Sequence, residues 1–110
     1  MRLVWSAPAL AHLDAIRQYL EQESSPHYAE RFVQRLVMAP ERLAAFPESG
    51  RVVPEGDGRH REVIERPYRV LYRLDREVVY IVAVVHGSRD LNASLIAEVE
   101  RLFPDVERVV

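Results

Sequence analysis

The stretch YRVLYR at residues 68–73 decides much of the fold, because apolar and charged side chains alternate along it. Val70 and Tyr72 share one face of an extended chain, since successive side chains of a strand point to opposite faces. Arg69 and Arg73 share the other face. We therefore predict a strand that packs its apolar face on the rest of the domain and presents two arginines on the opposite face.

Two more runs of β-forming residues flank this strand. They span residues 62–66 and 78–85, and tight connections at 67–68 and 75–76 join them to the strand predicted over 69–74. Connections this short imply antiparallel neighbours, so the three strands form a meander. The last run is apolar on both sides, with even-numbered residues on one face and odd-numbered residues on the other, which is typical of a central strand.

Two helical patterns precede the meander. After a short strand over residues 3–5, Ser6 is the predicted N-cap of a first helix that ends around Glu23. Ser25 and Pro26 begin a second helix. The two helices form an antiparallel hairpin.

The second helix has an apolar stripe that continues beyond Pro40. The stripe comprises Ala29, Phe32, Val33, Leu36, Leu43 and Phe46. Proline removes a helical hydrogen bond and crowds the preceding turn, so we predict a kink or a break near Ala39.

Residues 47–60 are rich in glycine and proline and are predicted to form a loop, and the apolar spacing over residues 92–103 predicts a C-terminal amphipathic helix. The predicted order is β-α-α-β-β-β-α. This order places the chain in the α+β class, as an antiparallel sheet with a helical hairpin packed on one face.

Composition excludes several classes of site. There is no cysteine, and the four histidines at positions 12, 27, 60 and 86 show no ligand spacing, so we expect no metal and no cofactor. All fifteen basic residues are arginines, and the net charge of −2 gives no general attraction to nucleic acid. We expect no membrane span and no signal peptide, and a cytoplasmic location is consistent with the lack of cysteine.

Five segments, in this order and at these distances, carry a resemblance to a known family. They are WSAPAL (5–10), AERFV (29–33), LAAFPESGR (43–51), YRVLYR (68–73) and HGSRDL (86–91). Together they resemble the ParE branch of the ParE/RelE superfamily of type II toxin–antitoxin toxins. The resemblance covers residues 1–91 as a toxin domain, and we interpret residues 92–110 as a helical extension of the same domain.

The resemblance implies a growth-arresting toxin that forms a hetero-oligomer with a cognate antitoxin. For the ParE branch it implies a ParD-like antitoxin, with a ribbon–helix–helix DNA-binding part and a disordered C-terminal tail, and DNA gyrase as the target. The RelE branch of the same fold instead cleaves mRNA on the ribosome. We predict a gyrase inhibitor that is not itself an enzyme. A toxin-like fold that has lost toxicity and only binds its antitoxin is a further alternative.

The endoribonuclease alternative needs cations for the phosphate and an acid and a base for proton transfer. The candidates are Arg61, Glu62, Arg69, Arg73, His86 and Arg89. Such enzymes in this superfamily use lysines and a late tyrosine or histidine, whereas this chain has no lysine and no tyrosine after Tyr80. The structural alternative is that Arg69 and Arg73 pair with Glu62 and Glu65 on a neighbouring strand.

A pure binding function needs only a surface. An apolar groove between hairpin and sheet would accept an antitoxin tail that folds on binding. The residues predicted to bind a partner are Leu13, Tyr19, Phe32, Leu36, Arg69, Arg73, His86 and Arg89.

Overall fold

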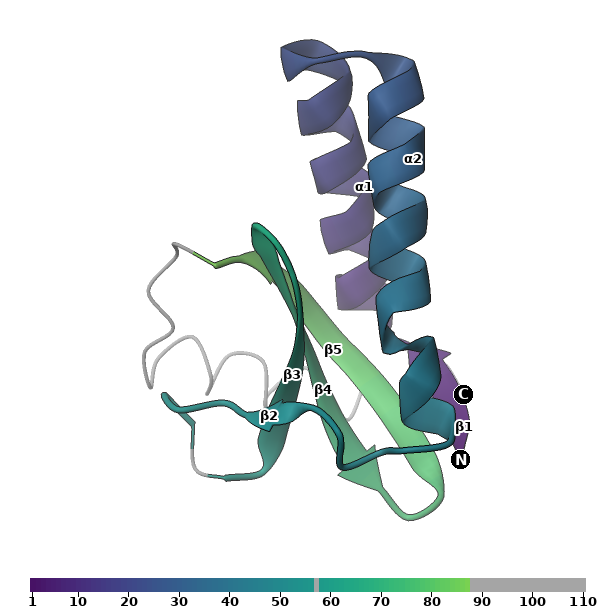
Figure 1. The fold of residues 1–110 in the computed structure, drawn as a ribbon, viewed down its shortest axis with the longest axis vertical. Helices are drawn as coiled ribbons and strands as arrows, with labels where there is room; N and C mark the ends of the chain where they lie inside the picture. The colour runs from purple at the N-terminus through teal and green to yellow at the C-terminus, as the bar shows by residue number, and fades with distance from the viewer. Residues whose placement is uncertain (57, 88–110) are drawn as a thin grey trace.

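A helical hairpin and a five-stranded sheet make up the two layers of the fold in a computed structural model, which describes residues 1–56 and 58–87 (Figure 1). The α+β class and the hairpin on one face of the sheet are confirmed. The predicted helix over residues 92–103 lies outside the described residues. No helix in the described part of the chain is long and apolar enough to cross a membrane.

The hairpin consists of α1 (Ala7–Glu23) and α2 (Pro26–Met38). Both helices begin as predicted, because Ser6 and Ser25 each accept a hydrogen bond through their hydroxyl from the backbone N–H three residues on, at 3.0 and 3.1 Å. The lower part of the hairpin packs on the sheet, and its tip projects beyond the sheet edge (Figure 1).

The predicted break at Pro40 is confirmed. The α-helix ends at Met38, and a 3₁₀ helix, η1 (Ala39–Ala44), follows it. Leu43 is fully buried as predicted, but the prediction for Phe46 is wrong, since its side chain is 67% exposed. The helical spacing no longer holds for Phe46, because the chain leaves the 3.6-residue period at the break.

The sheet has the order β1-β5-β4-β3-β2. Its strands are β1 (Arg2–Trp5), β2 (Arg51–Val52), β3 (His60–Glu65), β4 (Tyr68–Asp75) and β5 (Val78–His86). The predicted antiparallel meander of β3, β4 and β5 is confirmed, and β5 lies inside the sheet as predicted.

Two pairings were not predicted. β1 runs parallel to β5, so the prediction of an entirely antiparallel sheet is wrong at this edge. The connection between the two strands, which contains both helices, η1 and the other three strands, is long enough for a parallel pair. β2 lies within the segment predicted to be a loop, and it pairs antiparallel with β3 through Arg51 and Glu62. The surrounding glycines and prolines concealed this two-residue strand.

A β-bulge in β5 corrects the predicted alternation of its side chains. Leu71 pairs with Ala83 but Tyr72 pairs with Ile81, so Val82 is an extra residue on β5. Beyond the bulge the faces exchange: Val84 joins the core beneath the helices, whereas Ala83 belongs to the cluster on the opposite sheet face. The bulge therefore brings His86 to the helix-bearing face, opposite Tyr68.

Tyr72 attaches the segment after η1 to the sheet. Its buried hydroxyl donates a hydrogen bond to the Pro47 carbonyl at 2.7 Å and accepts one from the Gly50 N–H at 3.0 Å. A side chain at Gly50 would collide with the Tyr72 ring. These two hydrogen bonds hold residues 47–50, which lead into β2, against β4.

We predict that Tyr72→Phe lowers the free energy of unfolding by about 1–3 kcal/mol, because it leaves a buried donor and a buried acceptor without their partner. Urea denaturation of purified protein measures this. Tyr28→Phe is the matched control, since Tyr28 is 46% exposed and no such pair depends on its hydroxyl. Equal unfolding energies for the Tyr72 variant and the wild type would contradict the prediction.

Candidate functional site

Four charged side chains form one network on the sheet face opposite the helices. At its centre the carboxylate of Glu62, which is fully buried, accepts a hydrogen bond from Nε of Arg69 at 2.6 Å. The other oxygen of Glu62 accepts from Nε of Arg51 at 2.9 Å. Both oxygens of this carboxylate are thus occupied by arginines from neighbouring strands.

Arg69 also binds Glu55, which lies in the chain after β2. Nη1 and Nη2 of Arg69 donate to the two oxygens of Glu55 at 3.0 and 3.1 Å, in a bidentate pair. The hydrogen bonds from Arg69 lower the pKa of the Glu55 carboxyl. The network of Arg51, Glu55, Glu62 and Arg69 is neutral in sum, and its buried charges are compensated within it.

The predicted arginine face is only partly confirmed. The pair between Arg69 and Glu62 forms as predicted, but Arg69 is 7% exposed and is not presented to solvent. Glu65 pairs instead with Arg35 of α2, at 2.6 Å. Arg73 lies on β4 opposite His60 and is half-buried.

Two further endoribonuclease candidates are Arg61 and Arg89. The guanidinium group of Arg61 has hydrogen-bond partners within the fold. Arg61 donates through Nη1 to the carbonyls of Glu48 and Gly50, at 3.0 and 2.9 Å. This pairing supports the same segment that Tyr72 holds. Arg89 lies outside the described residues, so its role stays a prediction.

His86 ends β5 beside an aromatic cluster. Its ring meets the ring of Tyr68 edge to face, with centroids 5.3 Å apart at an angle of 76°. Tyr68 in turn contacts Phe32 of α2, at 5.8 Å between centroids. Burial raises the pKa of the Tyr68 hydroxyl, which keeps this phenol protonated near neutral pH.

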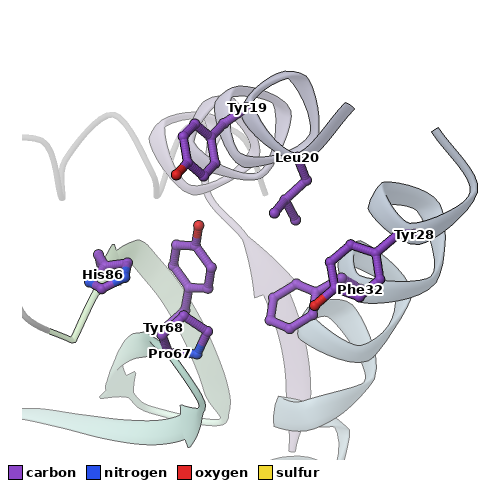
Figure 2. A pocket seen from close by; sticks show the side chains of 7 residues that line it. All are labelled: Tyr19, Leu20, Tyr28, Phe32, Pro67, Tyr68 and His86. Carbon is purple, nitrogen blue, oxygen red and sulfur yellow. The ribbon is translucent and has the colours of Figure 1, made fainter. Parts of the chain in front are cut away.

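These rings line a hollow of about 420 Å³ between the hairpin and the ends of β4 and β5. Its lining residues are Tyr19, Leu20, Tyr28, Phe32, Pro67, Tyr68 and His86. Figure 2 shows the hydroxyl groups of Tyr19 and Tyr68 directed toward each other across the hollow, with α2 contributing the opposite wall. None of the described lining residues is an aspartate, a glutamate or an arginine.

The predicted partner-binding residues divide into two groups. Leu13, Phe32 and Leu36 are buried in the core beneath the hairpin, so they support the surface from within. Tyr19 is 56% exposed and lies at the hollow. Sequence reasoning missed Tyr28 and Pro67 as lining residues of this hollow. The spacing of four residues between Tyr28 and Phe32 on α2 was a usable signal for Tyr28.

The sequence pattern of the ParE toxin of the type II toxin–antitoxin system parDE matches residues 3–91. The chain belongs to the ParE toxin family. This confirms the resemblance that the sequence segments indicated.

Individual relatives agree with this assignment. This ParE-family chain is 39% identical to Toxin RelE2 of Caulobacter vibrioides, over 80% of this chain and 97% of that protein. It is 29% identical to Toxin ParE3 of the same organism, over 86% of this chain and 94% of that protein. The solved structure of a chromosomal ParDE TA system from P. aeruginosa matches with a TM-score of 0.67 and 28% identity, covering 78% of this chain and 95% of that one.

We predict that Glu62→Ala destabilises this ParE-family protein by about 3–5 kcal/mol, because it leaves the buried guanidinium of Arg69 without its nearest carboxylate. Glu65→Ala is the matched control, since it removes a pair with the largely exposed Arg35 and should cost about 1 kcal/mol or less. Chemical denaturation measures both, and similar losses for the two variants would contradict a special role for the buried pair.

We also predict that the network weakens in acid. Because the pKa of Glu55 is lowered in the folded protein, its contribution to stability is complete above the ordinary carboxyl value of 4.5 and is lost as the pH falls through the lower, folded value. Thermal unfolding midpoints of Glu55→Gln should therefore depend less on pH in this acidic range than those of the wild type. Glu41→Gln, an exposed change on η1, should follow the wild type. If the unfolding midpoints of Glu55→Gln and the wild type changed equally with pH, the role assigned to the Glu55 carboxylate would be contradicted.

Proposed function

We propose that this chain is a toxin that arrests growth by inhibiting DNA gyrase in the cytoplasm, without cleaving RNA itself, and that a ParD-like antitoxin neutralises it. The fold and the family are compatible with both gyrase inhibition and mRNA cleavage. We therefore consider whether the charged side chains are available to bind and cleave RNA.

The observation that carries the proposal is the buried network. Metal-free RNA cleavage needs cations that reach a phosphate, together with an acid and a base at the same place. Here all three guanidinium nitrogens of Arg69 donate to carboxylates, and both oxygens of Glu62 accept from arginines. Releasing either group for catalysis would leave a buried charge uncompensated.

Inhibition of a large enzyme by binding needs a surface and no chemistry from this chain. The parDE description of the matching family and the two relatives named ParE3 and ParDE support a ParE-type target. They equally support an antitoxin as the partner that holds the toxin inactive. We propose a ribbon–helix–helix antitoxin whose C-terminal tail orders on the toxin surface.

An mRNA endonuclease is the second candidate. A hollow of about 470 Å³ at the strand ends is lined by Arg51, Arg66, Arg69 and His86, which brings an imidazole near several guanidinium groups. The relative named Toxin RelE2 also favours this alternative by name. Arg66 is the exposed arginine of this set without an ion pair in the described part of the chain.

Inducing the protein in bacteria and sampling early separates the two activities. A gyrase inhibitor should produce cleaved DNA held by gyrase and a DNA-damage response while mRNA stays intact. Early fragmentation of mRNA with normal supercoiling would overturn the proposal. Absence of any growth arrest by soluble, folded protein would instead favour a fold that only binds its antitoxin.

Two controls make the comparison specific. Co-expression of a cognate antitoxin should remove the arrest. If mRNA is cut by the wild type, His86→Gln should abolish that cutting in a true endonuclease, since it removes the imidazole at the strand ends. Cutting that persists in this variant would point to a contaminating nuclease.

A further inference from the structure

Three hollows share lining residues and adjoin one another from α2 to the ends of β4 and β5. The central one is the 420 Å³ hollow of Figure 2. A second, of about 250 Å³, shares Tyr28 and Phe32 with it and adds His27, Arg31 and Arg35 of α2. The third, of about 470 Å³ at the strand ends, shares Pro67, Tyr68 and His86 with it and adds arginines including Arg66. We call this continuous surface the arginine-ended groove.

The charges that the described lining residues contribute to the groove are all of one sign. None of those residues in the three hollows is an aspartate or a glutamate, whereas arginines line both ends. Arg35, Arg51 and Arg69 have carboxylate partners at the groove margins. Arg31 and Arg66 are exposed and form no ion pair within residues 1–56 and 58–87. One such arginine lies at each end.

The centre of the groove differs from its ends. Leu20, Phe32 and Pro67 give it an apolar floor, and its volume suits a large side chain. Two exposed rings, Tyr19 and Tyr28, stand at its rim, 56% and 46% exposed. An exposed aromatic rim around an apolar hollow is typical of a site that takes an anchoring side chain.

A single-stranded nucleic acid fits this surface less well than a peptide. Base stacking needs open ring faces, but Phe32 and Tyr68 are 5% and 7% exposed and pack on each other, and Tyr68 also packs on His86. Tyr19 and Tyr28 are left for stacking among the described rings of the hollow, and they stand at its rim.

We propose that the groove binds a segment of the antitoxin in which a large apolar side chain is flanked on both sides by acidic residues. The apolar side chain fills the central hollow beside Tyr19 and Tyr28, and the flanking carboxylates pair with Arg31 and Arg66. This inference rests on the proposed antitoxin partnership and adds the chemistry by which the partner is recognised.

Synthetic peptides test the inference with the full-length chain. The probe has a central Trp-Leu pair flanked by glutamates, and its binding is followed by fluorescence anisotropy. The matched probes replace the glutamates by lysines, or the Trp-Leu pair by serines. We expect the first peptide to bind, both matched peptides to lose binding, and added salt to weaken the first complex.

Variants of the chain locate the contact. Arg31→Glu and Arg66→Glu should each weaken binding of the acidic peptide about tenfold or more, because each reverses a charge at one end of the groove. Tyr19→Ala should weaken it by loss of the central contact. Arg42→Glu is the matched control, an exposed arginine of η1 outside the groove, and it should bind as the wild type does. Thermal unfolding checks that every variant is folded.

The outcomes separate cleanly. No binding of the acidic peptide to the wild type, or equal binding of the lysine peptide, overturns the inference. Binding of an oligothymidine that Arg31→Glu and Arg66→Glu abolish overturns it in favour of a nucleic-acid groove. The proposed function is tested by a different measurement, which is whether the wild type arrests growth when no antitoxin is present. Failure of one proposal therefore does not imply failure of the other.

Discussion

The burial of Glu62 against Arg69 is the interaction on which the rest of the sheet depends. A carboxylate and a guanidinium taken out of water must find complete partners, because the desolvation cost of each is large. Glu62 therefore holds Arg51 of β2, and Arg69 holds Glu55 in the following segment. A two-residue strand and a glycine-rich segment, which are weak by themselves, are fixed to the sheet by charge compensation. The same contacts occupy the charged atoms of Arg69 and Glu62.

A second constraint is geometrical and acts at the end of β5. The bulge at Val82 adds one residue to β5 that has no partner on β4. Because side chains alternate between the two faces of a strand, the residues after the bulge change faces. His86 is thereby turned toward the helices, where it contacts Tyr68. Position 86 is thus placed on the helix-bearing face, whereas Glu62 and Arg69 belong to the opposite face, and the imidazole approaches the arginines only at the strand ends.

Under the proposed function, the surface that matters is the central hollow, which lies beside these two features. The hairpin provides Tyr19 and Tyr28, the meander provides Pro67 and Tyr68, and the central hollow is lined by residues of both layers. Buried rings in the floor keep the hollow in shape, since Phe32 contacts Tyr68 directly. A preformed site of this kind lowers the ordering cost of a bound partner, which matters when the partner is itself a disordered tail.

The sequence by itself determined the layers of this protein. Ser6, Ser25 and Pro40 act on their own helices through local hydrogen bonds and sterics, and the alternation at residues 68–73 needs only the period of a strand, so these features were predictable. The family was predictable as well, because short segments in a fixed order identify it. Tertiary structure alone decided the parallel pairing of β1, the strand β2, the bulge and the closure of the charge network. Each of these depends on partners distant along the chain. The residues next to an arginine in the sequence do not show whether its guanidinium group will pair with a carboxylate or remain in solvent.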